Sequence, residues 1–400
     1  MRPTGLIAAR RSMMMGQPTP FYHDGIHLDF RDDRAAAHYV KAINGAVTLG
    51  ALTTLFSFTG DNKSYYMGPA GVLIPSVTNT PRIEYTQAGQ VLGLKMEQTR
   101  ANLALYSCDG TNAVWTKSNC TAAMTATGPD GVASSATTLT ATAGNATCLQ
   151  SITSASATRA AAVWLKRRTG TGNIDMTVDN GTTWTTKTIT TTWTRYYIVQ
   201  ASVTNPIIGL RIVTSGDEVD FWNEQIETAS ISTSDVPTTS AQVTRASETC
   251  ARTLGTEFSA TAGTVVARFV SPYATDAALN AFLFNFDDGT SNERIGVLRL
   301  ANQSNYRLNV TDGGVNQAAI DKNFATASAR ATLAVAWAAN DFASALNGSS
   351  VSTDSAGTLP TVTTLLLGYQ ATPTNWFNGG HLTTFDYYPT RLPNNFLVTA

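Results

Sequence analysis

The chain has 400 residues, of which 43% are hydrophobic and only 14% are charged. Lys and Arg total 27 and Asp and Glu total 28, so the net charge is −1. This balance argues against a protein that binds nucleic acid through excess basic charge, and the hydrophobic share argues against a disordered chain. Thr, Ser and Asn take the place of the missing charge, and these residues suit strands and turns rather than exposed helices.

The first hundred residues are predicted to be an irregular section with one short helix and several short strands. Asp32 or Asp33 is a suitable N-cap for a helix over residues 35–42, and Gly45 would end it. Short apolar runs separated by Gly, Pro and Asn then predict strands between turns. These runs are residues 49–58, 72–74 and 83–85. No run approaches the ~18 apolar residues of a membrane span, so no membrane contact is expected.

Residues 101–244 are rich in Thr and Ser and carry the strongest hairpin signal in the chain. Residues 174–179 alternate between apolar and polar side chains, Asn180-Gly181 follows, and residues 182–189 read as a second strand. Asn-Gly favours the tight turn whose twist matches two antiparallel strands. Further strands are predicted at residues 193–199, 207–213 and 218–222. This segment is predicted to form a β-sandwich.

Residues 245–400 show the same pattern with less Thr. Strands are predicted at residues 263–270, 281–286, 295–300, 306–310, 331–338 and 365–368. Gly, Asn and Asp lie between them, and no long helix is evident. The predicted fold is therefore all-β, with an irregular section at residues 1–100 followed by two antiparallel β-sandwich (jelly-roll) domains at residues 101–244 and 245–400.

The cysteines and histidines give little indication of a metal site. The four cysteines lack CxxC spacing, which favours free structural thiols, with a disulfide framework as the alternative. They are Cys108, Cys120, Cys148 and Cys250. Four scattered histidines argue against a His-based zinc site. His23 and His27 are four residues apart, but Gly25 argues against a helix that would join them.

Three stretches of the sequence form a recognisable pattern. They comprise residues 81–85, 92–97, 100–107, 115–117 and 128–131, then 217–227, 232–239 and 243–246, and finally 377–380 and 387–393. In this order and spacing they resemble a family of tailed-phage and prophage virion proteins, from about residue 55 to the C-terminus. The sequence departs from the family at Lys95-Met96, where two aliphatic residues are usual, and at Asp220-Phe221, which is more polar than usual.

The resemblance implies an N-terminal attachment section, a carbohydrate-binding-module-like sandwich and a concanavalin-A-like (laminin-G-like) sandwich. It implies a place on the virion surface, as a tail fibre, spike or head decoration that contacts host glycans. Its expected partners are other virion proteins, through the N-terminal section, and host polysaccharide. A purely structural decoration or adaptor protein without a ligand is the alternative. Fibres and spikes are commonly trimers, but no heptad repeat supports a homo-oligomer here.

Aromatic side chains are the best candidates for sugar contact, because sugar C–H faces stack on aromatic rings. The candidate ligand-binding residues are Trp184, Trp193, Tyr196, Trp376 and Asn378. The alternative for each is a place in the packed core, which is favoured for Trp164 and Trp222 because apolar residues flank them.

Asp287-Asp288-Gly289, with Asn292 and Glu293, offers oxygen ligands suited to Ca²⁺. A hairpin turn explains the same residues and is favoured. No other cofactor is expected. The acidic residues at 217–227 offer a carboxylate pair for glycoside hydrolysis, but no nucleophile elbow, zinc helix or phosphate loop is present. The protein is therefore not expected to be an enzyme, and a polysaccharide depolymerase is the least favoured function.

Overall fold

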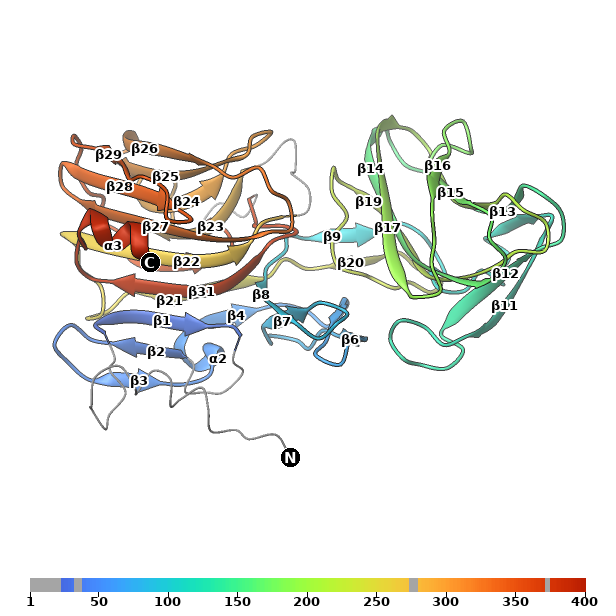
Figure 1. Cartoon of the computed structure of the whole chain (residues 1–400), viewed down its shortest axis with the longest axis horizontal. Helices are drawn as coiled ribbons and strands as arrows, with labels where there is room; N and C mark the ends of the chain where they lie inside the picture. The colour runs from blue at the N-terminus through green and yellow to red at the C-terminus, as the bar shows by residue number, and fades with distance from the viewer. Residues whose placement is uncertain (1–22, 32–37, 273–279, 371–374) are drawn as a thin grey trace.

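The computed structural model describes residues 23–31, 38–272, 280–370 and 375–400. Its regular structure is nearly all β, in sheets whose strands pair antiparallel, which confirms the predicted fold class. Two sandwiches lie side by side along the long axis of the molecule (Figure 1). We call them the large sandwich and the inserted sandwich.

The large sandwich contains a ten-stranded and a seven-stranded sheet. The main path of the ten-stranded sheet is β29 (Ser352–Asp354), β28 (Asp341–Leu346), β27 (Arg330–Ala338), β22 (Ala262–Val270), β31 (His381–Tyr388), β1 (Gly25–Asp29), β2 (His38–Lys41) and β3 (Val47–Leu49). β8 (Val91–Lys95) pairs with β31 and with β7 (Arg82–Tyr85). The seven-stranded sheet is β26 (Val315–Asn323), β25 (Asn305–Asp312), β24 (Arg294–Arg299), β23 (Ala281–Asp287), β30 (Thr364–Leu367), β21 (Thr249–Thr253) and β4 (Ser57–Thr59).

The sheets of the large sandwich enclose one core that draws on both ends of the chain. Ile26 and Leu28 from β1 are fully buried in it beside Phe385 and Tyr387 from β31. The outer face of β22, β27 and β28 carries small residues such as Ala334. The C-terminal helix α3 (Asn394–Thr399) covers this face with Leu397.

Most strands of the first hundred residues therefore join the sheets of the large sandwich. Strands β1, β2, β3, β7 and β8 extend the ten-stranded sheet, and β4 extends the seven-stranded sheet. The predicted domain boundary at residue 100 therefore separates strands that belong to the same two sheets of the large sandwich. Residues 32–37 of the predicted helix lie outside the described residues. Residues 38–41 form strand β2 instead, because pairing with β1 buries Tyr39 and Val40. Among the described residues of this region, a short helix, α2 (Leu52–Leu55), lies between β3 and β4.

The inserted sandwich has two five-stranded sheets around a second core. One sheet is β10 (Thr116–Ser118), β13 (Ala146–Ser151), β18 (Ile207–Ile212), β15 (Ile174–Thr177) and β16 (Thr185–Lys187). The other is β11 (Cys120–Ala126), β12 (Ala136–Ala141), β19 (Glu218–Thr228), β14 (Ala157–Thr169) and β17 (Thr194–Val203). The predicted hairpin joins β15 to β16: Asn180 and Gly181 have φ of 60° and 74°, and Ile174 pairs with Lys187.

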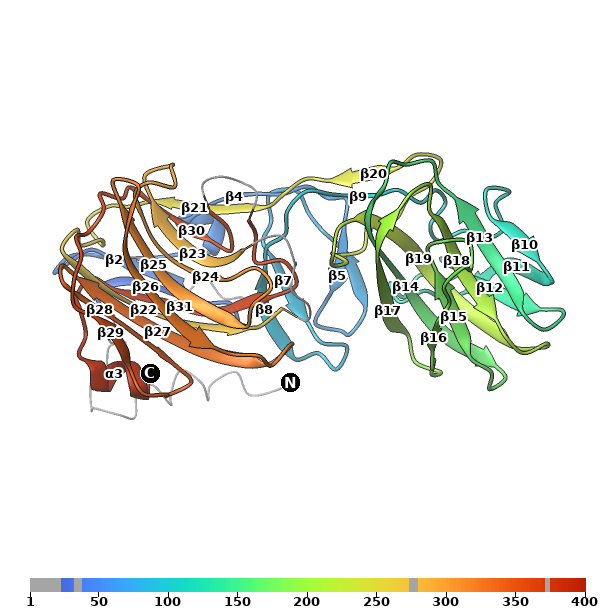
Figure 2. The same ribbon diagram turned by 90° about the horizontal axis from the view of Figure 1, so that it is seen from above.

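A two-stranded ribbon carries the chain between the sandwiches. It leaves the large sandwich through β9 (Arg100–Asn102) and returns through β20 (Val243–Arg245), with Asn102 opposite Val243 (Figure 2). The residues between these strands are thus inserted into the large sandwich. A small hairpin of β5 (Tyr65–Met67) and β6 (Leu73–Pro75) lies beside the junction.

Candidate functional site

The inserted sandwich has one outer face that the rest of the molecule covers. Met67 and Leu73, from the β5–β6 hairpin, form a hydrophobic cluster with Trp164, Trp193 and Trp222. These tryptophans come from β14, β19 and the residue before β17, all of one sheet. That sheet lies toward the large sandwich in Figure 1.

Trp193 and Tyr196 are therefore packing residues in this structure. Trp193 is buried, its indole N–H donates to the Thr127 carbonyl at 3.2 Å, and Lys166 lies over its ring. Tyr196 is half-buried against the core of the inserted sandwich, and its hydroxyl donates to the Thr188 carbonyl at 2.8 Å.

The other outer face, on β10, β13, β18, β15 and β16, brings Trp184 together with two charged residues. Arg211 on β18 is the register partner of Thr147 on one side and Asp175 on the other, and Asp175 pairs with Thr186. Partners in register point to the same face of a sheet. We call these five residues, Thr147, Asp175, Trp184, Thr186 and Arg211, the Trp184 face.

An ion pair and a cation–π contact fix the side chains of the Trp184 face relative to one another. The Arg211 guanidinium lies 4.4 Å from the centroid of the half-buried Trp184 ring. Nε and Nη2 of Arg211 donate to Oδ2 of Asp175 at 2.9 and 2.6 Å. The other oxygen of Asp175, Oδ1, is buried and has no hydrogen-bond partner among the described residues. The face thus offers an aromatic ring, a planar cation and two hydroxyls, with the cation held in place by the buried Asp175.

Trp376 and Asn378 lie in the interior of the large sandwich, near the junction. Trp376 is 3% exposed, stacks on Tyr369, and donates its indole N–H to the Glu248 carbonyl at 2.8 Å. Asn378 Oδ1 accepts the backbone N–H of Gln98 at 3.0 Å, and the residue is 5% exposed. Both side chains therefore fix the chain where it enters β9, and neither offers a surface to a sugar.

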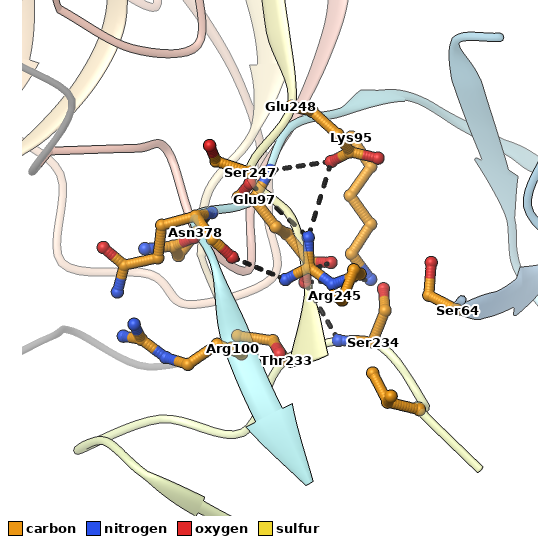
Figure 3. Close-up of polar contacts among 12 residues, drawn as sticks. Ser64, Lys95, Glu97, Arg100, Thr233, Ser234, Arg245, Ser247, Glu248 and Asn378 are labelled. Carbon is orange, nitrogen blue, oxygen red and sulfur yellow. Dashed lines mark hydrogen bonds and ion pairs between the residues drawn. The ribbon is translucent and has the colours of Figure 1, made fainter. Parts of the chain in front are cut away.

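Four buried charged residues meet at this junction: Arg82, Glu97, Arg245 and Glu248. Arg82 makes a two-point ion pair with Glu248 and donates to Oε2 of Glu97 at 2.8 Å. It also donates to the Ser234 hydroxyl at 2.7 Å, and Glu97 accepts the Ser234 N–H at 3.1 Å. Figure 3 shows Glu97, Arg245, Glu248 and Ser234 converging between the sandwiches. We call the four charged residues the junction cluster.

Electrostatics explains why Arg82 and Glu97 stay ionised although they are buried. Burial alone would lower the pKa of Arg82, but the carboxylates of Glu248 and Glu97 raise it overall. Burial alone would raise the pKa of Glu97, but Lys95, Arg245 and Arg82 hold it well below its usual range. All four residues lie in the segments that carry the family resemblance or directly beside them, so those segments have a structural role at the junction.

The two departures from the family pattern also form ion pairs. Lys95 Nζ lies 2.9 Å from Oε2 of Glu84 on the neighbouring strand β7. Asp220 lies 3.2 Å from Lys166 and 3.0 Å from Arg168, both on β14.

Asp287 and Asp288 form a turn. Oδ1 of Asp287 accepts the Gly289 N–H at 3.0 Å, and its Oδ2 accepts the amide of Asn285 at 2.7 Å. Oδ1 of Asp288 accepts the N–H and the hydroxyl of Thr290. Their oxygens thus serve the local backbone and side chains, in agreement with the favoured hairpin turn.

The structure instead brings His23, His27 and Asp386 together, although the sequence argued against a His-based site. Their ligand atoms lie within 4.8 Å of one another. The grouping arises from strand pairing, since His27 on β1 is directly opposite Asp386 on β31. The four-residue spacing of His23 and His27 would indicate a shared metal site only on a helix. No local sequence pattern indicates that Asp386 lies beside them.

Sequence reasoning also missed Arg211 and Asp175. Trp184 was identified as an aromatic in polar surroundings, whereas Asp175 on β15 of the same hairpin and Arg211 on β18 come beside it only through strand register. The four cysteines carry free thiols, two of them buried. In the described part of the chain, no helix is long and apolar enough to cross a membrane.

No protein-family model and no curated protein sequence matches this chain. Among solved structures, the sialidase CBM40 module of Ruminococcus gnavus bound to α2,3-sialyllactose is 16% identical, covering 35% of this chain and 83% of that one, with a TM-score of 0.30. NanB sialidase of Streptococcus pneumoniae is 13% identical, covering 36% and 24%, with a TM-score of 0.31. A pentraxin of Limulus polyphemus is 14% identical, covering 36% and 71%, with a TM-score of 0.28.

Proposed function

We propose that this protein is a phage virion-surface protein whose inserted sandwich binds host glycans without cleaving them. The virion setting, as a fibre, spike or head decoration, rests on the sequence resemblance. Glycan binding is supported above all by the Trp184 face, the outer face of the inserted sandwich that places an aromatic ring beside polar groups. Other virion proteins would contact the N-terminal section, and a trimeric assembly would multiply the sites.

The chemistry of the Trp184 face suits a sugar. An indole ring offers an apolar surface to sugar C–H groups, while a guanidinium donates to hydroxyl or carboxylate oxygens in fixed directions. Thr147 and Thr186, the register partners of Arg211 and Asp175, extend the polar surface. A shallow, mostly polar surface of this kind binds weakly, and many copies on one particle would raise the overall affinity by avidity.

A panel of immobilised bacterial and animal polysaccharides tests the proposal. Sialyllactose, the ligand named for the CBM40 module, belongs in the panel together with neutral and acidic capsular glycans. We expect the full chain to bind at least one class, and Trp184→Ala to weaken that binding about tenfold or more through loss of ring contact. Tyr197→Ala is the matched control, because Tyr197 is 40% exposed on strand β17 of the opposite sheet.

The result that would count against glycan binding is equal binding by the wild type and Trp184→Ala, or no binding across the panel. A structural adaptor without a ligand is the second candidate. It is favoured by the contact between Trp184 and Arg211, which itself stabilises the face. An adaptor would show no glycan binding, whereas its removal would reduce particle assembly or stability. Release of reducing sugar from any polysaccharide would instead support a depolymerase.

A further inference from the structure

We propose that His23, His27 and Asp386 bind a divalent transition-metal ion, with Zn²⁺ the best fit. The inference is independent of glycan binding and concerns the other end of the molecule, where the chain enters the ten-stranded sheet. Two imidazoles and one carboxylate form a ligand set that Zn²⁺ uses in proteins, with a water molecule at the fourth position.

Strand register places two of the three ligands. β1 and β31 pair antiparallel, with His27 opposite Asp386. Nδ1 of His27 contacts Oδ1 of Asp386 directly. A tetrahedral Zn²⁺ site separates ligand atoms by about 3.3 Å, so a small rotation of either side chain would admit the ion between them. The His27 ring is held against Tyr39 on β2, with 5.1 Å between ring centroids.

The third ligand, His23, is oriented by contacts that leave one nitrogen directed at Asp386. Its ring stacks on Tyr388 at a centroid distance of 4.1 Å, and its backbone N–H donates to the Tyr39 hydroxyl. Nδ1 of His23 lies 2.8 Å from the Asp24 carbonyl, which can only accept a hydrogen bond, so Nδ1 carries the proton. In the neutral ring Nε2 therefore carries a lone pair, which is the form that binds metal.

Nε2 of His23 is the ligand atom of this cluster that has no hydrogen-bond partner among the described residues. It is buried, makes no hydrogen bond among the described residues, and lies 3.7 Å from Oδ1 of Asp386. A lone pair facing a carboxylate oxygen is unfavourable, and a metal ion between the two atoms would accept electron density from both. The hydrogen bond from Nδ1 to a carbonyl is also the second-shell support typical of metal-ligating histidines.

The neighbouring charges leave room for one such ion. Arg268 approaches the other oxygen of Asp386, Oδ2, at 3.7 Å, so Oδ1 remains directed at the histidines. Arg31 is engaged by Asp29, and Lys41 by Asp24. A bound ion would tie the start of β1 to the last strand of the same sheet. It would thus fasten the N-terminal end of the described chain to the large sandwich.

Metal titration of the full chain, freed of any affinity tag and treated with chelator, tests the proposal. We expect one equivalent of Zn²⁺ by isothermal calorimetry and a thermal unfolding midpoint that rises with Zn²⁺ and returns with chelator. His23→Gln and Asp386→Asn should each weaken binding about tenfold or more. His38→Gln is the matched control, because His38 lies on the neighbouring strand β2 but outside the cluster.

Co²⁺ absorption provides a readout independent of folding stability. Visible bands of a four-coordinate Co²⁺ ion should appear with the wild type and His38→Gln and be lost with His23→Gln. No Zn²⁺ binding at micromolar concentrations, or equal binding by the wild type and His23→Gln, would overturn the proposal. Circular dichroism of each variant establishes that it is folded, and His23→Gln is the mildest change since His23 is half-buried outside any strand.

Discussion

Glu224 is a carboxyl group placed in an apolar core. It lies on β19 two residues from Ile226, which faces the core of the inserted sandwich, and it is 1% exposed. Neither of its oxygens has a hydrogen-bond partner among the described residues. Burial without a partner favours the neutral acid and raises the pKa of Glu224 to about 8.

This raised pKa predicts that stability falls as pH rises. Below the ordinary value of 4.5 the group is protonated in both the folded and unfolded chain, so its burial carries no ionisation penalty. Between pH 4.5 and about 8 only the unfolded chain ionises, and the free energy of unfolding should fall by roughly 1 kcal/mol per pH unit. Denaturant unfolding across this range measures the slope.

Glu224→Gln removes the titration and should flatten that part of the pH profile. Glu218→Gln is the control, because Glu218 lies on the same strand, is half-buried and accepts the Thr140 hydroxyl at 3.0 Å. An unchanged slope in Glu224→Gln would show that another group causes the pH dependence.

At the scale of elements, the junction is where the inserted and large sandwiches meet. The β9–β20 ribbon has only three residue pairs, so it contributes few backbone hydrogen bonds. The junction cluster adds a buried set of ion pairs between β7, the segments flanking the ribbon, and Ser234. The desolvation penalty of such buried charges is offset only while every ion-pair partner is present.

Removing one partner of the junction cluster should therefore be strongly destabilising. Arg82→Met leaves the carboxylates of Glu97 and Glu248 buried without their main cation, at an expected cost of about 3–5 kcal/mol in unfolding free energy. Arg307→Met is the control, since Arg307 forms an exposed ion pair with Asp321 worth at most about 1 kcal/mol. Similar unfolding midpoints for the two variants would contradict this role of the cluster.

Local signals in the sequence predicted many of the elements correctly. Asn180-Gly181 marked a hairpin because two residues with positive φ suffice to define that turn. The run of β-forming residues at 263–270 likewise indicated strand β22. The helix predicted over residues 35–42 was wrong at residues 38–41, because pairing with β1 decides their conformation. Polar strand β26 gave no alternating apolar signal.

Contacts between distant parts of the chain could not be predicted in this way. His27 and Asp386 are separated by 359 positions, and Arg82 and Glu248 by 166. Neither pairing leaves a local pattern, since each partner is a common residue in an ordinary strand or turn. The Trp184 face is an intermediate case, because Trp184 was identified while Asp175 and Arg211 became relevant only through register.

At the scale of the whole molecule, the chain is one sandwich inserted into another. The large sandwich needs residues from both sides of the insertion, since β31 pairs with β22 on one edge and with β1 and β8 on the other. The inserted sandwich has its own core, and the chain enters and leaves it through β9 and β20.

This arrangement predicts how fragments behave. Residues 245–400 alone would expose the edges of β31 and β21 and should be insoluble or aggregate. A chain in which a short Gly-Ser loop joins Asn102 to Val243 should retain the large sandwich, because these residues are already paired. Solubility and circular dichroism of these two shortened chains distinguish them. A stable, soluble 245–400 fragment would contradict the role assigned to the N-terminal strands.

The proposal that the Trp184 face binds glycans is tested most directly by a crystal structure of the full chain with the oligosaccharide that binds most tightly. We expect sugar density against the Trp184 ring, within hydrogen-bond distance of Arg211. Sugar density on another surface, with the Trp184 face free of it, would contradict glycan binding at this face.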